Sequence, residues 1–106
     1  MNAVEISEVM ARQQASGELY LEFLRVPSLS VGLYALPAGS RDPQTPHGED
    51  EVYYIISGRG FIRVGSEDRK VLPGSVVFVA GEVEHHFHTV TEDLKILVFF
   101  APAEGS

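Results

Sequence analysis

Two histidines and one carboxylate are the residues of this chain whose types and spacing indicate chemistry. His47 and Glu51 lie in the segment Pro-His-Gly-Glu-Asp-Glu, and His85 follows in Glu-Val-Glu-His-His-Phe. Two imidazoles and one carboxylate are a common ligand set for a divalent transition metal that keeps open positions for water or substrate. The sequence therefore predicts a metal centre, provided that the fold brings His85 back onto the first segment. Taken alone, His47 and Glu51 have a simpler interpretation as a solvated loop histidine and an exposed glutamate.

The composition is that of one domain spanning residues 1–106, because the chain of 106 residues is 44% hydrophobic and has room for a single core. It contains no cysteine, so a metal would have to be held by His, Asp or Glu side chains. The net charge of -7 argues against nucleic acid as a partner, since phosphate backbones are bound by clustered Lys and Arg.

The hydropathy pattern predicts neither a membrane segment nor an export signal. No apolar run approaches the roughly 20 residues that a bilayer-spanning helix needs, and the N-terminus Met-Asn-Ala-Val-Glu-Ile lacks the profile of a signal peptide. We therefore expect a cytoplasmic protein with no membrane partner.

The order of apolar blocks predicts one short helix followed by strands. Ser7 is a candidate cap for a helix that runs to Gln14 or Ala15 and stops at Gly17, which makes residues 1–17 an N-terminal helical segment. Strands are expected over residues 19–26, 29–36, 52–56, 61–64, 76–79, 86–90 and 94–100. Gly58-Arg59-Gly60 would end the third of them. Without a second helix to cross over, these strands predict an antiparallel sandwich or barrel over residues 18–101, with residues 102–106 as a tail.

Two of the blocks, residues 76–80 and 96–101, are apolar at every position. A strand with one face in water would alternate, so something must cover the second face of each block. We expect a homodimer in which the partner subunit provides that cover. A second sheet and the N-terminal helix of the same chain are the alternative.

The motifs of the chain resemble those of the cupin family. Gly39-x5-Thr45-x-His47-x3-Glu51-x6-Gly58 is similar to the first cupin motif, in which Thr45 replaces the first of two histidines. The segment from Gly74 through Gly81 to His85 is similar to the second motif, although it lacks the proline and the final asparagine and has one extra residue before the histidine. The resemblance implies a small single-domain cupin: an all-β, double-stranded β-helix, or jelly roll, with a short N-terminal helix.

The resemblance also implies a ligand set, and strand alternation adds candidate substrate contacts. With Thr45 unable to supply an imidazole, the metal ligands are reduced to His47, Glu51 and His85, and the metal is zinc, iron, nickel or manganese; copper accepts the same groups. If these segments are strands, alternation gives His47 and Glu51 a shared face, as it does Glu51 and Tyr53, and His85 and Phe87. Tyr53 and Phe87 are therefore the predicted substrate contacts, with core packing an open alternative for Tyr53. His86 and His88 would face away from the metal.

Three functions follow from this resemblance. The first is a metal centre that binds a small organic ligand inside the barrel, with a dioxygenase, isomerase or lyase as the enzymatic version. The second is a non-catalytic module that binds or senses a small molecule. The third is a structural cupin that has lost its metal, an alternative raised by Thr45.

Overall fold

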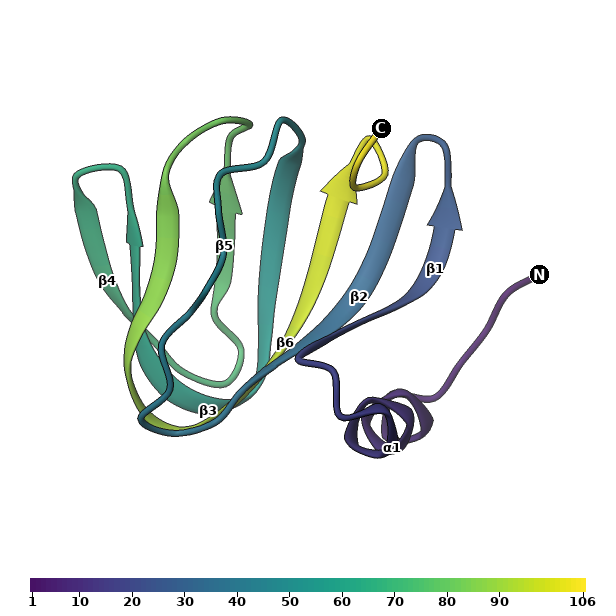
Figure 1. The fold of residues 1–106 in the computed structure, drawn as a ribbon, viewed down its shortest axis with the longest axis horizontal. Coiled ribbons are helices and arrows are strands. Elements are labelled where there is room, and N and C mark those ends of the chain that lie inside the picture. Colours follow the sequence, from purple (N-terminus) through teal and green to yellow (C-terminus); the bar gives the residue numbers. More distant parts are fainter.

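One antiparallel sheet of six strands forms the body of the molecule (Figure 1). The computed structural model describes all 106 residues. Its elements are α1 (Ile6–Ser16), β1 (Tyr20–Val26), β2 (Leu29–Leu36), β3 (Asp50–Val64), β4 (Glu67–Val71), β5 (Val76–Val79) and β6 (His85–Ala101). Hydrogen bonding orders the strands β1-β2-β6-β3-β4, and β5 pairs with β3 beside this path. The predicted all-β class with one short N-terminal helix is confirmed.

The helix α1 ends as predicted but begins differently. Gly17 closes it in the left-handed conformation, with φ 71°. The prediction that Ser7 is the N-cap was wrong, because Ser7 lies inside the helix; Glu5 occupies the cap position and its side chain makes no capping bond. Val9 is fully buried, and the helix packs against β1 and β2. No helix of the structure is long and apolar enough to cross a membrane.

Strands β3 and β6 are longer than the sequence indicated. Each joins two of the predicted strands, and the two pair with each other from Asp50 opposite Ala101 to Val64 opposite His85. The predicted end at Gly58-Arg59-Gly60 was wrong, because the register shifts there while the pairing continues. Such bulges bend a strand and increase its twist. They let the strand pair curl, which matters for the site because Glu51 and His85 lie near opposite ends of it.

Strand β4 has no counterpart among the predicted strands. Its sequence, Glu-Asp-Arg-Lys-Val, is exposed at every position except Val71. It pairs with β3 alone and so forms an edge of the sheet. Charged side chains on an edge strand discourage pairing with other molecules, and they also erase the apolar pattern by which a strand is recognised in a sequence.

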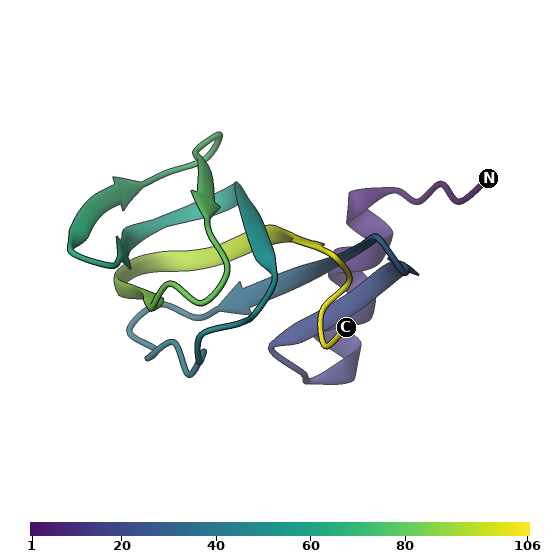
Figure 2. The ribbon, with the colours of Figure 1, turned by 90° about the horizontal axis from the view of Figure 1, so that it is seen from above.

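Residues 37–49 cross the front of the sheet without regular secondary structure (Figures 1 and 2). The segment connects β2 to β3 and carries Thr45 and His47. The expectation that His47 shares a strand face with Glu51 was therefore wrong, since β3 starts only at Asp50. Pro43 and Pro46, which have no backbone N–H to contribute to a ladder, agree with an irregular segment here.

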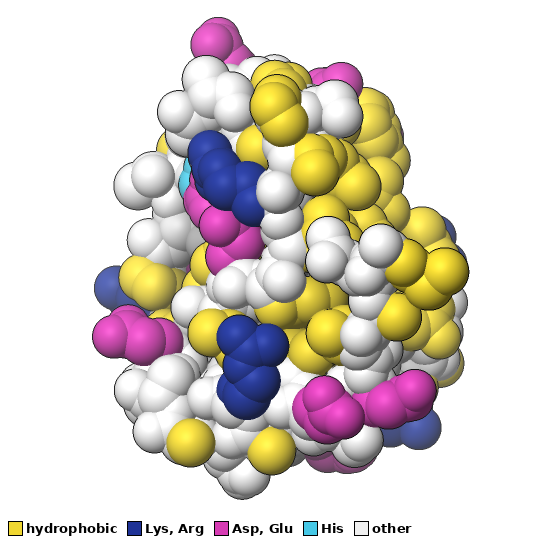
Figure 3. Space-filling view, turned by 90° about the vertical axis from the view of Figure 1, so that its right-hand side faces the viewer, with side chains coloured by type: hydrophobic (Ala, Val, Ile, Leu, Met, Phe, Trp, Pro, Cys, Tyr) yellow, Lys and Arg dark blue, Asp and Glu magenta, His cyan; other side chains and the backbone are white.

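The two faces of the sheet differ in how they are covered. The inner face holds a cluster of 13 buried residues that includes Tyr53, Ile55 and Phe87. On the outer side, Val76 and Phe78 of β5 are 63% and 61% exposed. A groove of about 510 Å³ with mostly apolar lining runs beside Phe78 over β3 and β6, and hydrophobic side chains gather along one side of the face in Figure 3. The helix covers only the β1–β2 end of the outer face.

Replacing Gly58 by alanine should destabilise the protein strongly. Gly58 has φ 95°, and a Cβ there would overlap the carbonyl oxygen of Asp93 in β6. We expect Gly58→Ala to lower the free energy of unfolding by roughly 3 kcal/mol or more, as the sum of left-handed strain and steric overlap. Denaturant unfolding measures this loss.

Gly74→Ala is the matched control for Gly58→Ala. Gly74 has nearly the same conformation, φ 94°, but a Cβ there would meet no atom within 4 Å. Gly74→Ala should therefore lower the free energy of unfolding only by the backbone strain, about 1–2 kcal/mol. Equal losses in the two variants would contradict the close approach of β3 and β6.

Candidate functional site

Asp42 fixes the irregular segment to the sheet. Its buried carboxylate accepts hydrogen bonds from the Tyr34 hydroxyl at 2.6 Å, the Phe87 backbone N–H at 2.8 Å, and the side-chain and backbone N–H groups of Gln44 at 2.9 and 3.1 Å. Four donors satisfy an ionised carboxylate well. These bonds turn the amide oxygen of Gln44 toward Tyr53, whose hydroxyl donates to it at 3.0 Å.

The side chains of Glu51 and His85 meet in the interior. Glu51 Oε1 lies 3.1 Å from His85 Nε2, and both side chains are 1% exposed. The Tyr53 hydroxyl lies 2.9 Å from the same imidazole nitrogen. The curled strand pair therefore brings together two of the three predicted metal ligands and the predicted neighbour Tyr53.

The backbone defines which nitrogen of His85 is available. His85 Nδ1 lies 2.8 Å from the carbonyl oxygen of Val83, which can only accept, so Nδ1 carries a proton. In the neutral ring Nε2 then holds a lone pair. This arrangement, an imidazole whose Nδ1–H is held by a carbonyl, is the usual support of a metal-binding histidine.

In the metal-free protein, a proton on His85 Nε2 can provide the positive charge beside the Glu51 carboxylate. The single hydrogen of Tyr53 is donated to Gln44, so a bond between Tyr53 and His85 Nε2 requires a proton on Nε2. Burial lowers the pKa of His85, but the Glu51 carboxylate and the Val83 carbonyl raise it by more, so the net shift is above the ordinary 6.5. Without a metal, the Glu51 carboxylate thus favours the protonated form of His85.

The carboxylate of Glu51 lacks the donors that Asp42 has. Both of its oxygens are buried, and neither receives a hydrogen bond of good geometry. A buried carboxylate without donors is costly unless a positive charge lies beside it. The donor set, one unsatisfied carboxylate and one oriented imidazole, fits a divalent metal.

His47 is near this pair but faces elsewhere. Its ring centroid is 6.2 Å from that of His85 and 5.1 Å from that of Phe100. Its Nδ1 lies 3.7 Å from Glu104 Oε2. No three His, Asp or Glu side chains converge in the structure so as to hold a metal. The ligand set of His47, Glu51 and His85 stays a prediction. Of its three members, only the side chains of Glu51 and His85 lie within contact distance of each other.

Glu104 is a site residue that the sequence analysis missed. It belongs to residues 102–106, which we expected to be a tail, yet Ala103 is fully buried and the backbone of Glu104 is held at both ends. Its N–H donates to Ser30 Oγ at 3.0 Å, and its carbonyl accepts from Arg25 at 2.8 Å. No sequence signal indicated this role, because Glu104 lies outside both motifs and its anchors are distant in the chain.

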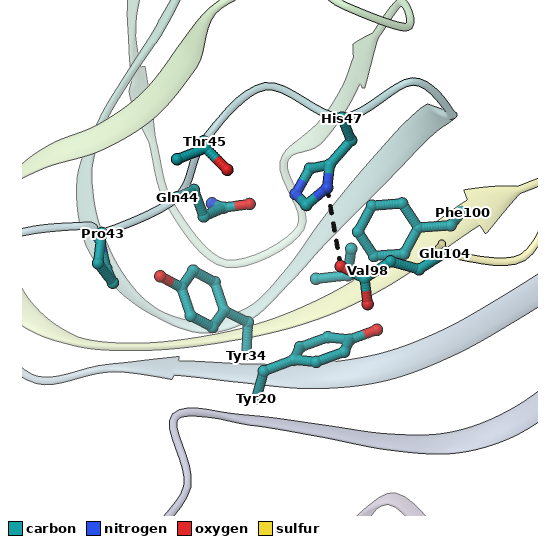
Figure 4. Close-up of a pocket in the computed structure, with 9 residues that line it drawn as sticks. All are labelled: Tyr20, Tyr34, Pro43, Gln44, Thr45, His47, Val98, Phe100 and Glu104. Carbon is teal, nitrogen blue, oxygen red and sulfur yellow. Dashed lines mark ion pairs between the residues drawn. The ribbon is translucent and has the colours of Figure 1, made fainter. Parts of the chain in front are cut away.

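A cavity of about 220 Å³ opens between the irregular segment and the sheet (Figure 4). His47 and Glu104 face each other on one side of it, and aromatic rings lie opposite the segment. Its lining consists of Tyr20, Tyr34, Pro43, Gln44, Thr45, His47, Val98, Phe100 and Glu104. Thr45 therefore faces the same cavity as His47, although neither residue is on a strand.

The predicted substrate contacts lie behind this lining. Tyr53 is fully buried, and its ring packs edge-on against Phe87, with centroids 5.0 Å apart. Neither side chain lines the cavity, so their role as substrate contacts stays a prediction. His88 bonds to Asp68 at 2.7 Å and stacks on Phe61, away from Glu51, as alternation from His85 predicted.

Comparison with known proteins decides the family. Residues 32–100 match the family model of the cupin domain. The chain belongs to the cupin family.

Relatives and solved structures agree with this cupin assignment. An uncharacterized protein of Streptomyces coelicolor is 50% identical over 105 residues, which cover 99% of this chain and 100% of that protein. The structure of TT1209 from Thermus thermophilus matches with a TM-score of 0.77 and 24% identity over 97% of this chain and 99% of the other. KdgF from Halomonas sp. matches with a TM-score of 0.72 and 18% identity, over 78% of this chain and 76% of the other. These structures support the jelly-roll fold.

The ion pair predicts a pH dependence of the metal-free cupin. Because the folded pKa of His85 is raised, the pair stabilises the protein below the unfolded value of 6.5, and this contribution is lost as pH rises through the folded pKa. Glu51→Gln should lower the pKa of His85 and remove the pH-dependent contribution. NMR titration of the His85 ring, with unfolding measured at each pH, tests both. A His85 pKa that is unchanged in Glu51→Gln would contradict the pairing.

Proposed function

We propose that this cupin binds a divalent transition metal through Glu51, His85 and His47, and that a small organic ligand occupies the adjacent cavity. The observation that carries the proposal is the Glu51 carboxylate, which is buried, receives no hydrogen bond of good geometry and lies 3.1 Å from an imidazole nitrogen. Such a carboxylate is stabilised by a cation, and the Val83 carbonyl already orients the imidazole for one.

The residues around the metal pair would act on the ligand in distinct ways. When bound, the metal would supply Lewis-acid polarisation of an oxygen on the ligand. In the metal-free protein, Tyr53 and Gln44 form a hydrogen-bonded chain to His85 Nε2. On metal binding, Nε2 would lose its proton and with it this bond, and the Val83 carbonyl at Nδ1 would keep the imidazole oriented. Thr45, in the cavity wall, provides a hydroxyl where the family motif has a histidine, which leaves one coordination position to water or ligand.

Metal binding should depend on Glu51, His85 and His47 and not on the neighbouring histidines. Protein purified without an affinity tag and loaded with zinc should hold one ion per chain by elemental analysis. Glu51→Gln, His85→Ala and His47→Ala should each reduce the affinity by a factor of ten or more. Occupancy should also fall as pH drops through about 6.5, because protons compete for the imidazoles.

His86→Ala is the control for the metal variants, since it removes an imidazole next to His85 in the chain but on the opposite face. It should retain full occupancy. Wild-type protein without a stoichiometric ion would favour a structural cupin, and an ion without turnover of any added substrate would favour a binding module.

We also propose that the exposed outer face is covered by a second copy of the chain. Val76 and Phe78 are the most exposed large hydrophobic side chains within the strands, and Phe78 lines an apolar groove over β3 and β6. Contiguous apolar surface of this kind marks an interaction site, and the symmetry of a homodimer would bury the same groove twice.

The dimer should be visible by light scattering at micromolar concentration. Phe78→Glu would place a charge in the buried interface and should give a monomer with an unchanged fold. Leu19→Glu is the control, because Leu19 is also exposed, at 40%, but precedes β1 and lies outside the strands of this face. A monomeric wild type would contradict the proposal.

A further inference from the structure

We infer that the cavity beside Glu104 takes a small organic cation, whose charged head lies among the Glu104 carboxylate and the rings of Tyr20 and Phe100. The inference rests on the proposed function, because it names the chemical class of the small organic ligand that was proposed to occupy this cavity. It is carried by the charge, the aromatic lining and the size of the cavity.

The charge of the lining favours a cation. No Lys or Arg lines the cavity, and Glu104 is its one carboxylate. The Glu104 carboxylate lies 3.7 Å from Nδ1 of His47. Its one basic neighbour in the cavity is therefore an imidazole that the proposed metal would keep neutral.

The basic side chain nearest to this region is already engaged. Arg25 donates to the Glu22 carboxylate at 2.9 Å and to the backbone carbonyl of Glu104 at 2.8 Å. It holds the tail in place from outside and does not line the cavity. An anionic ligand would thus find no Lys or Arg in the cavity, only the His47 imidazole, and would face the Glu104 carboxylate.

Aromatic rings form much of the remaining wall. Tyr20 packs edge-on against both Tyr34 and Phe100, with ring centroids 6.3 Å apart in each pair, and all three line the cavity (Figure 4). Aromatic faces attract ammonium groups, and cages of such rings bind quaternary ammonium ligands. The combination of rings with one carboxylate suits an alkylated ammonium head better than a neutral polar group.

The position of the Tyr20 ring requires a glycine at position 32 of the neighbouring strand. A Cβ on Gly32 of β2 would overlap the Tyr20 ring, so the ring lies over the backbone of Gly32. The Tyr20 hydroxyl is buried and has no hydrogen-bond partner in the structure.

The size limits the ligand. At about 220 Å³, the cavity is smaller than the ~300 Å³ at which pockets for drug-sized ligands begin. A trimethylammonium head with a short oxygen-bearing chain is of the right scale.

Choline and its neutral isostere 3,3-dimethylbutan-1-ol test the inference, because they share shape and hydroxyl and differ in the central charge. Binding is measured by NMR titration and calorimetry at low salt, on both metal-free and zinc-loaded protein. We expect choline to bind at least tenfold tighter than the isostere. Glu104→Gln should remove most of this selectivity, and Gly32→Ala should weaken choline binding by displacing the Tyr20 ring.

Glu92→Gln is the matched control for Glu104→Gln, because it removes the same charge from an exposed position on β6. It should leave choline selectivity unchanged, and circular dichroism and thermal unfolding verify that each variant is folded. Equal affinity for the two probes, no binding of either, or unaltered selectivity in Glu104→Gln would overturn the inference.

The outcomes for the ligand class and for the metal are separable. Stoichiometric zinc binding without a preference for choline over its neutral isostere would contradict the inference of a cationic ligand and leave the proposed metal site intact. A preference for choline in a protein that binds no zinc would contradict the proposed metal site and support the inference of a cationic ligand.

Discussion

A carboxylate buried without hydrogen-bond donors is the feature on which the rest of the site depends. Asp42 and Glu51 are both buried acids, but Asp42 receives four hydrogen bonds and Glu51 receives none of good geometry. Asp42 is thereby a structural residue that fixes an irregular segment. Glu51 needs a positive partner, and His85 supplies it as a protonated ring or, under the proposed function, as a co-ligand of a metal.

The geometry of the sheet brings this pair together. Along β3, Glu51 lies near one end, while the residue paired with His85 is Val64 at the other end. At about 3.3 Å per residue, a straight strand pair would hold the two side chains tens of ångströms apart. The bulges between Ile55 and Phe61, together with the glycine at position 58, allow the curl that closes this distance to 3.1 Å. The same curl leaves room for the cavity under residues 37–49.

The sequence was informative where polarity patterns and motif spacing reflect the fold. Turn residues and apolar blocks predicted an antiparallel β-protein, and the spacing of Glu51 and His85 predicted that they would meet. The patterns were uninformative about β4, whose charges hide its pairing, and about Gly58, which resembles a turn glycine but lies in a bulged strand. Glu104 could not be predicted, because its place in the cavity depends on backbone bonds to Ser30 and Arg25 from distant strands.

The central claim is that Glu51 and His85 bind a metal, with Nε2 of His85 as the donor atom. Nitrogen-15 NMR of the imidazole rings during a zinc titration tests it most directly, because it distinguishes the two ring nitrogens and their protonation states. The account predicts that stoichiometric zinc shifts His85 Nε2 to a metal-bound position while Nδ1 keeps its proton toward the Val83 carbonyl. A His85 spectrum unchanged by zinc, or binding through Nδ1, would contradict it.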